Sequence, residues 1–116
     1  NVTAVNGYIQ IGGLVGSNSN GGQVLNSSAS GDVISSQGYD AGGLVGGNWG
    51  SSLIQDSTAT GNVSSGSDFV GGLVGINQGR IIDASATGHV TGLDYVGGLV
   101  GKNSSLNPPT LFHTSR

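Results

Sequence analysis

The chain has 116 residues and a formal net charge of −3; 24 residues are glycine, 8% are charged, and there is neither cysteine nor methionine. The absence of cysteine excludes a disulfide framework and a thiolate metal site, and three basic residues argue against nucleic acid and anionic membranes as partners. The apolar runs are too short for membrane insertion, and no signal peptide is recognisable.

Residues 1–10 precede a repeat and are predicted to form an N-terminal cap or a lead-in strand. The word GGLVG then occurs four times, with starts 30, 29 and 26 residues apart, and each copy is followed one residue later by asparagine. The copies are Gly12–Gly16, Gly42–Gly46, Gly71–Gly75 and Gly97–Gly101. Such self-similarity is typical of an architecture in which each repeat stacks on the next.

A second block lies between these copies, beginning at Val24, Leu53 and Ile81, and it alternates in polarity as a strand does. Because successive side chains of a strand point to opposite faces, Leu25 and Ile82 are predicted to point inward with the alanines, and the hydroxyl positions outward. Within GGLVG both faces are partly apolar. Either both faces are covered, or the glycine pair bends the chain.

These patterns predict an all-β fold, a right-handed parallel β-solenoid of about four coils of 26–30 residues over residues 11–103. Coils stacked at about 4.8 Å would give a body roughly 20 Å long. Equal positions then form ladders, in which asparagine amides hydrogen-bond along the axis; asparagine also tolerates the left-handed turn conformation. The predicted structural ladders are Leu14, Leu44, Leu73 and Leu99, and Asn18, Asn48, Asn77 and Asn103.

The C-terminal tail, residues 104–116, does not match the repeat. Pro108 and Pro109 stop a ladder because proline lacks the backbone donor. The tail either caps the last coil, which would block an edge that recruits another chain, or it reaches into a neighbouring subunit.

The order GGLVG-x-Asn, followed by a hydrophobic–Asp–Ser–Ala–Thr–Gly–x–Val block, resembles the GLUG repeat over Ile11 to about Asn103. The resemblance implies a bacterial extracellular protein at the cell surface or secreted. Such repeats occur in adhesin-like proteins and in non-catalytic parts of IgA-cleaving metallopeptidases. This chain has no HExxH motif, so peptidase activity is not carried over.

The sequence indicates no catalytic residue, no cofactor and no metal site. His89 falls in an outward column with Asp32 and Asn62, which predicts a solvated strand position. Two pairs of aspartates align between repeats and could share a cation, but their spacing matches no calcium loop, and solvated carboxylates are the preferred interpretation. The two pairs are Asp56 with Asp83, and Asp68 with Asp94.

Three further surface features are candidates for modification or binding. Four N-x-Ser/Thr sequons are possible glycosylation sites: Asn1, Asn26, Asn62 and Asn103. A hydroxyl array resembling the ladders of ice-binding solenoids comprises Ser28, Ser30, Thr58, Thr60, Ser85 and Thr87. Aromatic residues that could stack on sugar rings are Phe69 and Tyr95, which align, Tyr39 nearby, and Trp49 in a turn.

The sequence therefore predicts a non-enzymatic structural or adhesive module of a bacterial extracellular surface protein or fibre that assembles end to end. The expected partners are a second copy of the chain or host and surface glycans. The alternatives are a binding module, for ice or for glycans, and an accessory repeat region of a secreted peptidase. Fibre formation, thermal hysteresis or a flanking catalytic domain would distinguish them.

Overall fold

The computed structural model describes residues 2–4, 10–36, 40–66, 68–104 and 112–114, and every regular element in these ranges is a β-strand. All strand pairs are parallel, as expected for stacked coils. In the described part of the chain there is no helix of the length and apolarity needed to cross a membrane.

The strands form four sheets, and three of these sheets receive one strand from each coil. The first sheet has the order β1 (Val2–Ala4), β6 (Val33–Ser35), β11 (Val63–Ser65) and β15 (Val90–Thr91). The second has the order β2 (Gln10–Gly12), β7 (Asp40–Gly42), β12 (Phe69–Gly71) and β16 (Tyr95–Gly97). The third has the order β3 (Val15–Asn18), β8 (Val45–Asn48), β13 (Val74–Asn77) and β17 (Val100–Asn103).

The fourth sheet turns a corner, because the long strand β14 (Arg80–Ala86) pairs with two shorter strands of the preceding coil. Its members are β4 (Gln23–Leu25), β9 (Leu53–Gln55), β14, β10 (Thr58–Ala59) and β5 (Ser28–Ala29). Strand β18 (Phe112–Thr114) pairs in parallel with β14, with Phe112 opposite Ile81. Part of the predicted tail thus adds a strand beside the last complete coil.

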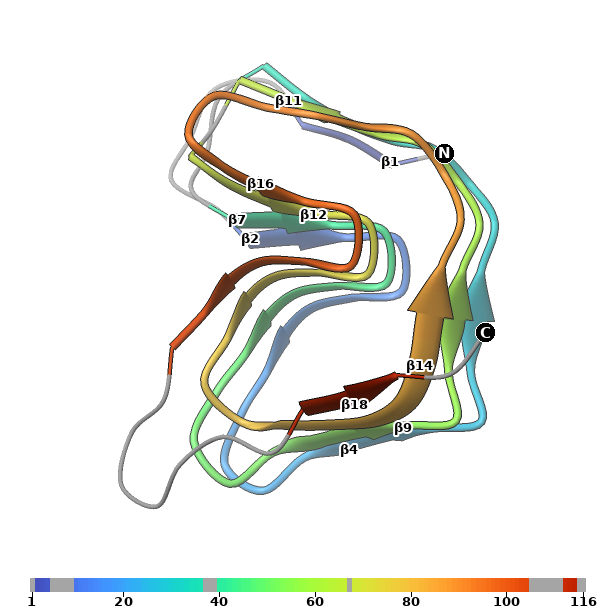
Figure 1. Ribbon diagram of the computed structural model, residues 1–116, viewed down its shortest axis with the longest axis vertical. Coiled ribbons are helices and arrows are strands. Elements are labelled where there is room, and N and C mark those ends of the chain that lie inside the picture. The colour runs from blue at the N-terminus through green and yellow to red at the C-terminus, as the bar shows by residue number, and fades with distance from the viewer. Residues whose placement is uncertain (1, 5–9, 37–39, 67, 105–111, 115–116) are drawn as a thin grey trace.

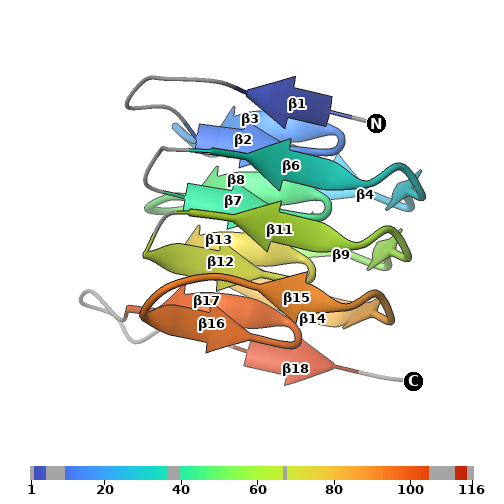
Figure 2. The same ribbon diagram turned by 90° about the horizontal axis from the view of Figure 1, so that it is seen from above.

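The coils wind as a right-handed parallel β-solenoid, so the predicted fold class is confirmed (Figures 1 and 2). Three passes, β1–β5, β6–β10 and β11–β14, are followed by a fourth that comprises β15–β18. Figure 1 looks along the shortest axis, on which the molecule extends 20 Å, against 33 and 26 Å across. The coil cross-section is therefore wider than the stack is long.

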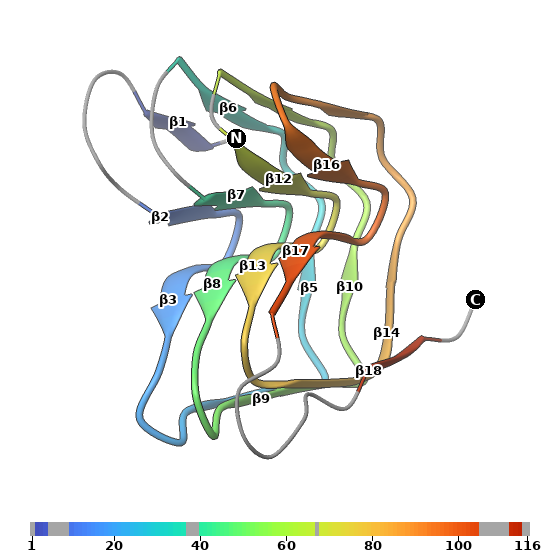
Figure 3. The same cartoon turned by 60° about the vertical axis from the view of Figure 1, so that its left-hand side comes forward.

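The GGLVG block folds the coil inward. This decides between the two alternatives that the sequence left for the block, two covered faces or a bend at the glycine pair. Strand β12 ends at Gly71 and β13 begins at Val74, and between them the chain reverses toward its entry side (Figure 1). The glycine pair therefore bends the chain. The same reversal recurs in every coil, and Figure 3 shows β3, β8, β13 and β17 side by side along the axis.

The reversal brings the second and third sheets into backbone contact, and glycine is required there. A Cβ atom on Gly71 would overlap the carbonyl oxygen of Val74 across the bend, and one on Gly75 would lie 2.7 Å from the amide nitrogen of Ala41. Real side chains do not approach other atoms so closely. The first and last glycines of the repeated word thus allow the two sheets to pack without side chains between them.

The inward fold divides the interior into two hydrophobic cores. The first and second sheets enclose the smaller core of Ile11, Val33, Ala41, Val63 and Val70. The third and fourth sheets enclose the larger core of Val24, Leu44, Val45, Ile54, Ala59, Leu73, Val74, Ile81 and Ala84. Adjacent Leu73 and Val74 are both fully buried, because the bend turns both side chains into the larger core.

The predicted inward position of Leu25 is wrong. Its side chain is 43% exposed, and the core position is taken by the preceding residue, Val24. The cause is the next residue, Asn26, whose φ of 49° lies in the left-handed region and turns the chain at a corner. After the corner the alternation holds: in the second copy, Ala59 is buried and its neighbour Thr58 is exposed.

Candidate functional site

A row of asparagine side chains runs along the axis at the ends of the third-sheet strands. The Nδ2 group of Asn18 donates to Oδ1 of Asn48 at 2.8 Å, and Asn48 donates in the same way to Asn77 at 2.8 Å. Asn77 donates to Asn103 at 2.9 Å. Every link runs in the same direction, from the earlier coil to the later one. We call these four residues the asparagine ladder.

The ladder also closes the turn between the third and fourth sheets. The Nδ2 group of Asn48 lies 3.4 Å from the carbonyl oxygen of Ser52 and 3.3 Å from that of Arg80. In the next coil, Asn77 donates to the carbonyl oxygen of Gly79, whose amide nitrogen donates back to Oδ1 of Asn77. Because these asparagines sit in strands and are not among the residues with positive φ, the expected left-handed turn conformation is not their role.

The leucines of the repeated word also stack. The amide nitrogen of Leu14 donates to the carbonyl oxygen of Leu44, that of Leu44 to Leu73, and that of Leu73 to Leu99. Leu44 and Leu73 are fully buried, whereas Leu14, in the first coil, is 50% exposed. The leucine and asparagine rows therefore follow one register through the four coils.

Hydrogen bonds from backbone amides to side-chain oxygens link the outward column of Asp32, Asn62 and His89. The amide nitrogen of Asn62 donates to Oδ1 of Asp32 at 2.8 Å, and that of His89 donates to Oδ1 of Asn62 at 3.0 Å. Among the sequons, Asn26 and Asn62 are exposed, whereas Asn103 accepts the last hydrogen bond of the asparagine ladder. Asn1 lies outside the described residues.

The six hydroxyl residues lie in two parallel columns, one in the strands β5, β10 and β14 and one just after the ends of these strands. Thr58 is opposite Ser28 on one side and Ser85 on the other. The second column is Ser30, Thr60 and Thr87. Backbone hydrogen bonds place these three residues beside one another in neighbouring coils. Five of the six residues are exposed and Ser85 is half-buried, so the array faces outward.

The first aspartate column has a conformational explanation. Asp56 and Asp83 stack with Asn26 at the corner of the fourth sheet, and all three have φ near 50°. Asp and Asn adopt this conformation more readily than other residues that carry a side chain. Asp68 and Asp94 align through the pairing of β12 with β16. Within the ranges that the structure describes, no three acidic or histidine residues gather as a metal site would require.

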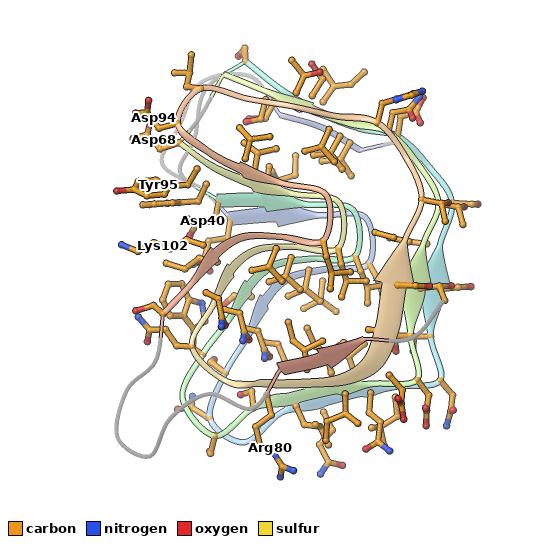
Figure 4. All side chains as sticks on the ribbon, in the orientation of Figure 1. Asp40, Asp68, Arg80, Asp94, Tyr95 and Lys102 are labelled. Atoms are coloured by element: carbon orange, nitrogen blue, oxygen red, sulfur yellow. The ribbon has the colours of Figure 1, made fainter. Side chains whose placement is uncertain are left out.

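An aromatic pair lies at the entry of the second sheet. The rings of Phe69 and Tyr95 stack with their centroids 5.0 Å apart, and Nζ of Lys102 lies 5.2 and 5.3 Å from the two centroids. In Figure 4, Tyr95 and Lys102 project from the same side of the coil as Asp68 and Asp94. Tyr39, the other aromatic residue predicted here, lies outside the described residues.

The column that contains Phe69 and Tyr95 also contains a buried polar residue, Asp40, which the sequence did not indicate. Asp40 is opposite Phe69 and is buried, and its Oδ2 accepts a hydrogen bond of 2.9 Å from Nε2 of Gln10. Trp49 donates from Nε1 to Oε1 of Gln10 at 3.4 Å. Burial raises the pKa of the Asp40 carboxyl, and the hydrogen bond from Gln10 opposes that rise. Aligning the residue two places before each GGLVG copy would have revealed this column.

The coils that stack in register define a repeat protein of the parallel β-solenoid class. The family model of the GLUG motif matches residues 7–34, 37–64 and 70–91, which together make up more than half of the chain. The chain belongs to the GLUG-motif family. The fourth GGLVG copy lies beyond the matched segments, yet β16 and β17 pair with β12 and β13 as the earlier copies do. Searches of curated proteins and of solved structures found no significant match.

Proposed function

We propose that this chain is a non-enzymatic structural module of a bacterial extracellular protein, a stiff spacer whose outer faces are available for adhesion. Membership of the GLUG family supports an extracellular repeat module. The observation that carries the structural role is the asparagine ladder, because its central side chains, Asn48 and Asn77, are wholly buried and hydrogen-bonded to the coils on both sides. Such contacts couple each coil to the next and resist bending between them.

Hydrogen exchange of the full chain tests this rigidity. In a stiff spacer the backbone amides of the central strands β7, β8, β12 and β13 exchange slowly and with similar rates, because they open only when the stack opens. The amides of β16 and β17 exchange faster. Central amides that exchange as fast as those of the last coil would contradict the spacer role.

The adhesive part of the proposal places glycan binding at the aromatic pair. Phe69 and Tyr95 offer ring surface, Lys102 offers a donor, and the nearby carboxylates of Asp68 and Asp94 accept from sugar hydroxyls. A glycan array with the full chain measures this activity. Tyr95→Ser is expected to abolish binding, and the control is Leu93→Ser, which alters another exposed residue of the fourth coil. Equal binding by both variants would contradict a site at the pair.

Ice binding is a second candidate, favoured by the two outward hydroxyl columns in and just after parallel strands. Thermal hysteresis is the readout. Thr58→Tyr would disrupt the centre of the array, whereas Ser64→Tyr places the same side chain at an exposed position of another sheet. Hysteresis lost only in Thr58→Tyr would support the array, and no hysteresis in the unaltered chain would exclude it.

A further inference from the structure

We propose that copies of this chain stack head to tail, with the last coil of one copy on the first coil of the next in the register of the internal coil contacts. The partner is a second copy of the chain, and the joint is centred on the hydrogen bond from Asn103 of one copy to Asn18 of the next. The inference rests on the proposed structural role and adds a partner, an orientation and a register to it.

The direction of the asparagine ladder supplies the first argument. Within the described residues the ladder begins at the amide oxygen of Asn18 and stops at the amide nitrogen of Asn103. One end therefore offers an acceptor and the other a donor, at the same place in the coil cross-section. A head-to-tail joint pairs them, whereas a head-to-head joint would place oxygen against oxygen.

The exposed apolar residues supply the second argument. Leu14 is 50% exposed in the first coil, whereas Leu44 and Leu73, in the same column, are fully buried. At the other end Val96 is exposed, whereas Val70, next in its column, is fully buried. These positions are apolar throughout the stack, and they are exposed only where it ends. A further coil on each end would cover them as the internal coils are covered.

The strand edges supply the third argument. Among the described strands, β2 and β3 are first in their sheets, and β16 and β17 are last. Each has one edge without a strand beside it, and such edges recruit further strands. Because every internal contact between coils is parallel, only a copy in the same orientation continues the ladders (Figure 2). A contact between two different ends does not close on itself, so repeated addition produces a filament.

The chemistry at the joint is compatible with stacking. Continuing the third-sheet column places Lys102 over Ser17 of the next copy, and continuing the second-sheet column places Tyr95 over Gln10. Neither contact sets like charges against each other. Val100 would meet Val15, which repeats the valine contacts inside the stack.

Sedimentation velocity and electron microscopy of the full chain test the proposal. The expected result is filaments whose subunit repeat is about 19 Å, the rise of four coils at about 4.8 Å each. Asn103→Asp keeps an oxygen that accepts from Asn77 but removes the donor at the joint and places a carboxylate against the Asn18 oxygen. This variant is expected to raise the critical concentration at least about tenfold. The control Ser64→Asp adds the same charge on an outer face and is expected to assemble as the unaltered chain does.

Leu14→Lys provides a second variant at the opposite end, and circular dichroism verifies that each variant keeps its strands. If Asn103→Asp assembles at the same critical concentration as the unaltered chain, the proposed register is wrong. If the unaltered chain stays monomeric, the proposed stacking is wrong. Hydrogen exchange on the same sample separates the two proposals. If the chain is monomeric but its central amides exchange slowly, the spacer role stands and only the head-to-tail joint is rejected.

Discussion

The side chains of Asn48 and Asn77 are both completely buried, and they are joined by a 2.8 Å hydrogen bond from Nδ2 of the first to Oδ1 of the second. An amide buried in an apolar interior is costly unless its donors and acceptor are satisfied. Here the repeat itself satisfies them, because each asparagine has an identical neighbour in the next coil. The buried asparagines are therefore satisfied only within the stack, and their hydrogen bonds in turn stabilise the stack.

Asn48→Ala is expected to lower the free energy of unfolding by about 2–4 kcal/mol, because Nδ2 of Asn18 and Oδ1 of Asn77 each lose one of their hydrogen-bond partners in a buried site. Denaturant unfolding measures the change. Asn103→Ala is the matched control, since this exposed residue ends the ladder and accepts from a single neighbour. Equal losses in the two variants would show that burial of the ladder contributes little.

Gly71→Ala is expected to destabilise the chain by about 3 kcal/mol or more, because the new methyl group overlaps the Val74 carbonyl oxygen where the two sheets touch. Gly98→Ala tests the same change in a repeated glycine whose added Cβ meets no atom within 4 Å. Thermal unfolding should show the Gly98 variant within about 0.5 kcal/mol of the unaltered chain or slightly more stable. A well-folded Gly71→Ala would contradict the backbone contact.

Asp40→Asn is expected to raise the melting temperature at pH 7, because it removes a buried negative charge and keeps an oxygen that accepts from Gln10. Since burial raises the pKa of the folded-state carboxyl above its usual value of 3.8, the unaltered chain gains stability as the pH falls through that raised pKa. The variant lacks this gain, so the difference between the two chains narrows on acidification.

Melting temperatures measured at several pH values test this prediction. Asp94→Asn makes the same change of charge at an exposed position and is the control. A difference between Asp40→Asn and the unaltered chain that widens toward low pH has the wrong sign and would rule out the desolvation argument.

Asp56→Ala is expected to cost about 1 kcal/mol, because alanine adopts the observed φ of 53° less readily than aspartate does. Asp56→Asn and Asp56→Gly should retain stability, since both residues accept this conformation. The three variants can be compared by thermal unfolding with and without calcium. A calcium-dependent rise in stability that is lost in Asp56→Asn would instead support a cation site at this corner.

Much of the fold follows from sequence because the interactions that specify it join like positions of successive repeats. Once GGLVG-x-Asn is aligned, the leucine and asparagine rows require only that coils stack. The inward bend could not be derived in this way. It depends on contact between Gly71 and Val74 within one coil and between Gly75 and Ala41 of the preceding coil, and alternation along a strand does not report either contact.

Two other features could not be predicted from the sequence, each for a physical reason. The single left-handed residue at Asn26 shifts the inward positions, so a strict period of two assigns Leu25 to the wrong face. Asp40 has a charged side chain, which predicts exposure, but its neighbours in the stack, Gln10 and Phe69, cover it. In a solenoid the environment of a residue is set by the same position one repeat away, more than by its chain neighbours.

The common direction of the asparagine links has an electrical consequence. Hydrogen-bonded amides arranged in a row polarise one another, so each added member strengthens the links already present. The backbone does not share this property, because some of its amide groups donate toward the later coil, as Leu44 does to Leu73, and others toward the earlier coil, as Thr58 does to Ser27. The side chains from Asn18 to Asn103 thus form an aligned row of dipoles whose cohesion per coil increases with the length of the stack.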